Sequence, residues 1–133
     1  MSRENVEIVR RIYAAWVAGS PVESDLLDSE IEWVNPEDAV ETGVRRGRGA
    51  FASVAESLGD TFGDLRVDFE RFIDVGDRVV VIGTMRGHGR GSGIEIERRQ
   101  GYVWTIRDGR AVRFEWFSDP GAALEAAGLD RDR

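Results

Sequence analysis

The hydrophobic and polar positions of the second half of the chain, from Leu65 to Ser118, alternate in a way that predicts a four-stranded antiparallel meander. Two short glycine turns, at 75–78 and 107–110, separate runs that are rich in β-forming residues. A third hairpin requires a bend within the glycine-rich stretch 87–93. The first strand of the meander spans about 65–75, and its apolar phase slips near Phe72, which indicates a β-bulge.

The last two strands show which side chains share a face of the predicted sheet. If Asp108-Gly109 closes a type I turn with a glycine bulge, Trp104 faces Val112 and Tyr102 faces Phe114. A two-residue turn would shift the register by one and mix the faces, so the bulged turn is preferred. The face predicted to be covered holds Arg98, Gln100, Tyr102, Trp104, Val112, Phe114, Trp116 and Ser118. Aromatic residues mixed with a few polar groups are typical of a small-molecule pocket.

The first half of the chain shows helical spacing instead. Residues 3–18 form one predicted helix, and 49–62 form another, which Gly63 ends. Between them, Ser20-Pro21-Val22-Glu23 resembles a capping box that starts a short helix, and 31–34 predicts a short strand.

Two further segments complete the predicted order of elements. Residues 35–48 form a charged, irregular loop that ends at Arg48; it is either a lip of the pocket or an ordinary solvated loop. After the meander, Asp119 as N-cap and Pro120 predict a short C-terminal helix that Gly128 ends. The last five residues, 129–133, are expected to fray.

Composition narrows the possible chemistry. The chain has 133 residues, enough for one domain with a hydrophobic core. It contains no cysteine and no lysine, which excludes thiol nucleophiles, Schiff bases and a Walker P-loop, and its only histidine is His88. The net charge of −7 disfavours nucleic-acid binding, and no apolar run is long enough to cross a bilayer. We therefore expect a cytoplasmic protein without metal or cofactor.

Several stretches carry a resemblance to a known family. They are Ile8-Val9-Arg10-Arg11-Ile12-Tyr13-Ala14-Ala15-Trp16, Ile31-Glu32-Trp33, Arg46-Gly47-Arg48-Gly49-Ala50, Gly76-Asp77-Arg78-Val79-Val80-Val81 and the segment from Trp104 to Arg113. In this order the chain resembles the SnoaL-like, polyketide-cyclase-like branch of the NTF2-like proteins, which also includes ketosteroid isomerases and limonene epoxide hydrolases. The resemblance implies an α+β, cone-shaped (cystatin-like) fold. Its curved antiparallel sheet is wrapped by three N-terminal helices and a short C-terminal helix. It implies no single reaction.

The isomerase residues are not preserved at the matching positions, which are Ile12, Asn35 and Tyr102. Asn35 does not accept a proton as a carboxylate does, so isomerisation by that mechanism is not expected. Tyr13 lies one residue from the helix position, which is ~100° around a helix, so it is not expected to substitute. No pair of inward carboxylates is found to match the epoxide hydrolases either.

The resemblance also implies an inward row on the strand from Arg78, namely Val80, Ile82, Thr84, Arg86 and His88. His88 is the candidate general base, against the alternative of an exposed and idle side chain. Arg98 and Tyr102 are the other catalytic candidates, as stabilisers of oxyanion charge. The alternatives are ion pairs for Arg86 and Arg98, and a core role for Tyr102 with its hydroxyl satisfied.

The ligand itself is predicted to be a small, hydrophobic, oxygen-bearing organic molecule. Its predicted contacts are Trp16, Trp33, Asn35, Arg86, Gln100, Trp104, Phe114 and Trp116. An apolar patch is expected on the outer face of the sheet, with no segment left to cover it, and this predicts a homodimer through that face. The patch comprises Val81, Gly83, Met85, Gly87, Gly101, Val103 and Phe117. Two functions remain open: cofactor-independent acid–base catalysis, such as isomerisation, cyclisation or hydration, and a binding module of the same shape.

Overall fold

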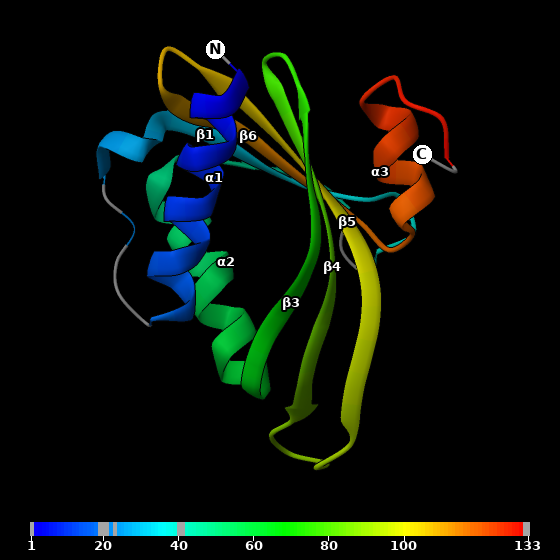
Figure 1. The fold of residues 1–133 in the computed structure, drawn as a ribbon. Coiled ribbons are helices and arrows are strands. Elements are labelled where there is room, and N and C mark those ends of the chain that lie inside the picture. Colours follow the sequence, from blue (N-terminus) through cyan, green and yellow to red (C-terminus); the bar gives the residue numbers. More distant parts are fainter. Residues whose placement is uncertain (1, 19–21, 23, 40–41, 132–133) are drawn as a thin grey trace.

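The computed structural model of the chain describes residues 2–18, 22, 24–39 and 42–131. Within these residues, a curved sheet of six strands carries helices on both faces, in the strand order β2-β1-β6-β5-β4-β3 (Figure 1). The sheet is mixed, because β1 (Leu27–Asn35) runs parallel to β6 (Arg110–Phe117). The expected α+β fold is therefore confirmed, whereas the expectation of a purely antiparallel sheet is wrong.

The helices cover the two faces unequally. Helices α1 (Ser2–Val17) and α2 (Arg48–Thr61) lie on one face, and the short α3 (Pro120–Ala126) lies on the other (Figure 1). The remaining elements are η1 (Ser24–Leu26), β2 (Gly43–Arg46), β3 (Phe62–Val75), β4 (Arg78–Gly89) and β5 (Glu95–Arg107). Helix α1 contacts β3 and β4, and α2 contacts β1 and β3, so together they enclose the larger of the two cores.

The two long N-terminal helices are confirmed, with small changes at their ends. Helix α2 ends at Thr61, and Phe62 is already extended, so β3 begins before Gly63. The short helix expected from Ser20 falls largely outside the described residues, and the segment that follows is a single 3-10 turn. Within the described part of the chain, two α-helices therefore precede the meander instead of three.

The segment expected to be a charged loop contains a strand. Strand β2 pairs antiparallel with β1, with Trp33 opposite Arg45. All four residues of β2 are exposed, which is why the sequence shows no apolar alternation there. Strand β1 itself extends four residues earlier than the predicted 31–34, to Leu27.

The predicted phase of β4 is wrong by one residue. Val79 and Val81 face the helices, because they pair with Trp104 and Tyr102 of β5. Val80 and Ile82 belong to the second core, on the face that α3 covers. By the alternation of the strand, the rest of the row expected inside lies on the α3 side as well; it consists of Thr84, Arg86 and His88.

The outer face of the sheet is not bare, because α3 packs on it. A Cβ atom on Gly101 would lie only 2.4 Å from the Cβ atom of Ala123, so the helix approaches the strand closely at this glycine. Val103 is buried there with Leu124. The expected apolar patch is therefore wrong: Val81, Gly83, Met85 and Gly87 lie on the inner face, and α3 covers much of the remainder. The homodimer stays a prediction without the patch that suggested it.

The β5–β6 hairpin reaches the predicted face by a different turn. Asp108 and Gly109 have φ values of 53° and 77°, so they form a two-residue turn. Val112 is then an extra residue in β6, since Thr105 pairs with Arg113 but Ile106 pairs with Ala111. This bulge restores the alternation. The predicted pairs were displaced by two residues, and the observed ones are Trp104 with Phe114 and Tyr102 with Trp116.

The C-terminal helix is confirmed, but the residues after it are more ordered than expected. The Asp119 side chain accepts a hydrogen bond from the Gly121 N–H at 3.2 Å, Pro120 is the first helical residue, and Gly128 has a φ of 82°. Leu129 packs against the second core, and Arg131 forms ion pairs with Asp119 and Glu125. These contacts contradict the expected fraying as far as Arg131. In the described residues, no helix has the length and apolar character needed to cross a membrane.

Candidate functional site

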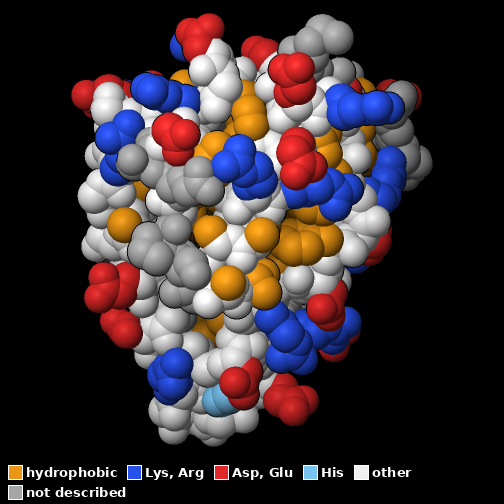
Figure 2. Space-filling view, turned by 60° about the vertical axis from the view of Figure 1, so that its left-hand side comes forward, with side chains coloured by type: hydrophobic (Ala, Val, Ile, Leu, Met, Phe, Trp, Pro, Cys, Tyr) orange, Lys and Arg blue, Asp and Glu red, His pale blue; other side chains and the backbone are white. Residues whose placement is uncertain are grey.

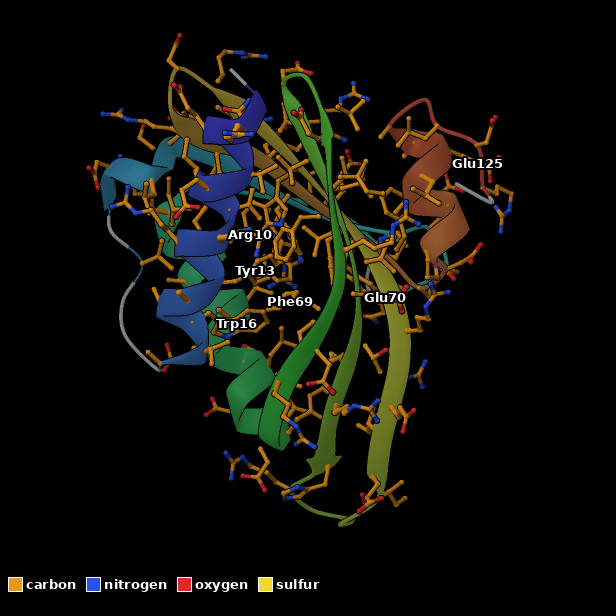
Figure 3. The ribbon with its side chains drawn as sticks, in the orientation of Figure 1. Arg10, Tyr13, Trp16, Phe69, Glu70 and Glu125 are labelled. Carbon is orange, nitrogen blue, oxygen red and sulfur yellow. The ribbon has the colours of Figure 1, made fainter. Side chains whose placement is uncertain are left out.

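An apolar cavity of about 300 Å³ lies between the two long helices and the sheet. Helix α1 presents Ile12, Tyr13 and Trp16 to it, positions that share the inward side of the helix. Figure 3 shows Tyr13 and Trp16 directed from α1 toward the sheet, with Phe69 of β3 facing them. The rings of Tyr13 and Phe69 are 4.7 Å apart between their centroids. Helix α1 therefore supplies one aromatic wall.

The sheet supplies the facing wall, and it does so with residues predicted from the sequence. Trp33, Trp104 and Phe114 line the cavity, and each is at most 7% exposed. The ring of Phe114 lies 4.6 Å from Trp33 and 4.5 Å from Trp104 between centroids, so the three side chains form one packed aromatic layer. With Trp16 on α1, four of the predicted ligand contacts lie around this cavity.

Helix α2 closes the cavity and brings in its only charged side chain among the described residues. Phe51, Ala52 and Ala55 line it from about one turn of the helix, with Arg48 at the start of the helix. Ala52 is the one exposed member of the described lining, so the cavity meets solvent beside it. Figure 2 brings the helical side of the molecule forward and shows hydrophobic side chains gathered in the middle of a face that charged residues surround.

One buried polar group of the lining is the hydroxyl of Tyr13. Its oxygen accepts a hydrogen bond from Trp104 Nε1 at 3.0 Å, and Tyr13 is 3% exposed. Burial raises the pKa of Tyr13 well above its ordinary value, and the nearby Tyr102 adds to the rise. The hydroxyl hydrogen has no acceptor among the described residues. Tyr13 is thus a neutral donor whose proton is not taken by any acceptor among the described residues.

Tyr102 and Gln100 point to the same face as predicted, but they satisfy one another. The Tyr102 hydroxyl donates to Gln100 Oε1 at 2.8 Å, and Gln100 is 6% exposed. Burial raises the pKa of Tyr102. The Tyr102 ring stacks on Phe114, behind the cavity lining, with centroids 5.9 Å apart. This is the core alternative considered for Tyr102, with its hydroxyl satisfied.

Asn35 joins two of the predicted tryptophans. Its Oδ1 atom accepts from Trp33 Nε1 at 2.8 Å and from Trp116 Nε1 at 2.7 Å. Neither Asn35 nor Trp116 lines the apolar cavity. Because both lone-pair directions of the amide oxygen are used, Asn35 holds the two indoles in place and contacts the site only through Trp33.

The predicted cluster of Arg86, His88, Arg98 and Gln100 is divided between the two faces. His88 Nδ1 lies 3.7 Å from an Asp64 carboxylate oxygen at the end of β4, and its side chain is 38% exposed. Arg86 forms ion pairs with Asp68 at 2.5 Å and Glu97 at 2.6 Å, the structural alternative considered for it. Arg98 lies on the inner side of β5 but is exposed. None of these three lines the cavity, so their predicted catalytic and binding roles have no support from its geometry.

A larger hollow, of about 770 Å³, lies at the surface near the β5–β6 turn. Its walls are charged side chains that largely neutralise one another, such as Arg46 with Glu32 at 2.6 Å. Exposed ion pairs of this kind are well solvated and leave little to recognise a ligand. In the described part of the chain, no three His, Cys, Asp or Glu side chains gather closely enough to hold a metal ion. The apolar cavity is therefore the better candidate site.

The sequence interpretation missed Tyr13, Phe51 and Arg48. The signal for Tyr13 was present, because it shares the apolar stripe of α1 with Trp16 at i+3. It had been set aside because Ile12 matched the family position, yet both side chains line the cavity. Phe51 was recognised as apolar but not as a wall, and Arg48 had been placed at the end of a loop.

The chain belongs to the SnoaL-like domain family, since the model of that family matches residues 9–114. Comparison with solved structures shows the NTF2-like fold. An NTF2-like protein of unknown function from Burkholderia pseudomallei K96243 is 25% identical, has a TM-score of 0.77, and aligns over 92% of this chain and 95% of its own.

Two further solved structures differ in their sequence identity to this chain. TerC, co-crystallised with polyporic acid, is 27% identical with a TM-score of 0.75, over 94% of this chain and 98% of its own. A protein with a ketosteroid isomerase-like fold from Catenulispora acidiphila DSM 44928, in complex with trimethylamine, is 18% identical with a TM-score of 0.70, over 96% of both chains. The latter is similar in fold alone. No curated protein matches the chain.

Proposed function

We propose that the protein binds a small, largely hydrophobic organic molecule in the cavity between α1, α2 and the sheet, through an oxygen atom on that molecule. The observation that carries the proposal is the Tyr13 hydroxyl, a buried donor whose hydrogen has no acceptor among the described residues. A buried donor without a partner costs roughly 1–3 kcal/mol, and a ligand oxygen would remove that cost.

The size of the cavity limits the ligand. A dry apolar cavity of about 150 Å³ holds benzene. The cavity here is about 300 Å³, at the lower end of the range for small-molecule sites. A one- or two-ring molecule therefore suits it. TerC, which is similar over nearly its whole length, was crystallised with a small organic molecule, which supports the same class of ligand.

A second function, catalysis without a cofactor, is favoured by the same hydroxyl. A neutral donor held in an apolar site stabilises negative charge that develops on a carbonyl oxygen, as acid–base enolisation and aldol-type cyclisation require. The described lining of the cavity contains no carboxylate and no imidazole, so it supplies no general base. The lack of a general base among the described lining residues favours ligand binding over catalysis.

The proposal is tested by titrating the protein with 2-acetylnaphthalene, a neutral two-ring ketone, in a calorimeter. We expect saturable binding to the wild type and its loss in Ala52→Trp, which fills the cavity from its exposed side. Ala14→Trp is the matched control, because Ala14 is exposed on α1 and lies outside the lining. Tyr13→Phe should weaken binding about tenfold or less, as expected for one neutral hydrogen bond.

Two results would contradict the proposal. Failure of the ketone to bind the folded wild-type protein would remove the cavity as a ligand site. Equal binding by Ala52→Trp and the wild type would place the ketone elsewhere on the molecule.

A further inference from the structure

The charge of the cavity points to a narrower class of ligand. Arg48 is the one charged side chain in the described lining, and a guanidinium stays charged at every physiological pH. The chain as a whole is acidic, with 25 carboxylate side chains against 18 basic ones. Even so, no carboxylate belongs to the described lining, and the positive charge of Arg48 is uncompensated within it.

Arg48 is fixed in place but not neutralised. Its Nε atom donates to the Leu27 carbonyl oxygen at 3.0 Å, which ties the start of α2 to the start of β1. The two terminal nitrogens have no partner among the described residues, although the side chain is half-buried. One nitrogen thus orients the guanidinium, and the other two remain available as hydrogen-bond donors.

Other arginines of the chain form ion pairs with carboxylates, which is the usual way to balance a guanidinium charge. Arg86 pairs with two carboxylates, Arg99 pairs with Glu70 at 2.6 Å, and Arg131 also pairs with two carboxylates. Arg99 and Arg131 are exposed, where an arginine needs a partner least, and Arg86 is half-buried, as Arg48 is. The half-buried Arg48, which needs one more, has none among the described residues.

The start of α2 adds to the positive electrostatic potential at Arg48. Its N-cap, Gly47, offers no side-chain hydrogen bond to the first turn, and no acidic residue lies in that turn. The positive end of the helix dipole, which begins at Arg48 itself, therefore has no acidic side chain in the first turn to balance it. A ligand carboxylate at this position would accept two charge-assisted hydrogen bonds from the terminal nitrogens.

We infer that the ligand of this cavity is an anion, a one- or two-ring molecule whose carboxylate binds Arg48. The inference rests on the proposed function, because it assigns the ligand class of the same cavity. The aromatic walls hold the body of the molecule, Arg48 holds its carboxylate, and Tyr13 is left to a second oxygen where the ligand has one.

The test compares two probes of similar shape, 2-naphthoate and the neutral 2-acetylnaphthalene, by calorimetry at neutral pH. The wild type should bind the carboxylate at least about tenfold more tightly than the ketone, as expected for a charge-assisted pair. Arg48→Gln should weaken carboxylate binding at least about tenfold and so remove that preference. Arg110→Gln changes the net charge equally at an exposed position outside the cavity, and it should keep the preference.

The possible outcomes distinguish the anion assignment from the proposal that the cavity binds a ligand. Equal binding of both probes by the wild type, or a preference that survives in Arg48→Gln, would overturn the anion assignment and leave the cavity intact. If neither probe binds the folded protein, both the cavity and the anion assignment fail. Retained ketone binding by Arg48→Gln also shows that the variant is folded.

Discussion

Asn35 shows how a single polar side chain organises aromatic residues without touching the ligand site. One amide oxygen accepts from the indoles of Trp33 and Trp116, which come from β1 and β6. These strands run parallel and are paired beside Asn35, so the amide fastens two segments that lie far apart in the sequence. Trp33 is 7% exposed, and its indole N–H depends on this acceptor.

Replacing Asn35 by Ala should therefore destabilise the protein. The change leaves two indole N–H groups without their acceptor, at a cost of about 1–3 kcal/mol in the free energy of unfolding. Urea denaturation followed by tryptophan fluorescence measures the loss. The matched control is Asn5→Ala, because the Asn5 side chain makes only an exposed hydrogen bond to the Gly76 carbonyl. An equal effect of the two variants would show that the Asn35 hydrogen bonds contribute no special stability.

The aromatic wall was predictable at this scale, and the role of the charged Arg48 was not. Trp104 and Phe114 could be placed because aromatic side chains alternate with smaller or polar ones along β5 and β6. Arg48 lies one residue before the predicted start of its helix, and such boundaries are poorly defined by sequence. Its role depends on which carbonyl lies nearby, here that of Leu27, and sequence spacing does not reveal this.

At the scale of elements, β4 shows where alternation stops being informative. Val79, Val80, Val81 and Ile82 are at most 1% exposed, because one face packs under the helices and the other under α3. A strand buried on both faces has no polar positions to set its phase. The phase of β4 therefore could not be determined from its own sequence, and the error carried His88 to the wrong face.

The close packing of α3 on β5 leads to a prediction for Gly101. A Cβ atom there would meet the Cβ of Ala123 at 2.4 Å and the Cα of Pro120 at 3.2 Å, both parts of α3. Gly101→Ala should therefore displace the helix and destabilise the protein by about 1–3 kcal/mol, as overpacking does.

Thermal unfolding measures this effect, and Gly91→Ala is the control. A Cβ atom on Gly91 would meet nothing within 4 Å, so that variant should unfold close to the wild-type temperature. If Gly101→Ala unfolds at the temperature of the Gly91→Ala variant, α3 does not pack tightly on the sheet. That result would reopen the outer face as a surface for association.

At the scale of the whole molecule, the tyrosines report on unfolding at alkaline pH, because they are buried and the chain has neither lysine nor cysteine. The chain has two tyrosines, Tyr13 and Tyr102, and both are buried in the larger core. Burial raises the pKa of each above the ordinary value near 10. The chain has no lysine and no cysteine, so no other side chain is expected to titrate close to that pH.

The free energy of unfolding should therefore be insensitive to tyrosine up to about pH 10 and should fall above it. In that range the unfolded chain releases tyrosine protons that the folded chain retains, so rising pH favours unfolding. Each tyrosine contributes a slope of up to about 1.4 kcal/mol per pH unit until its folded pKa is reached. In an alkaline titration, phenolate absorbance and loss of the circular dichroism signal should rise together. Tyr102→Phe should reduce the slope, and phenolate formation near pH 10 in a protein that keeps its circular dichroism would show that at least one hydroxyl is open to solvent.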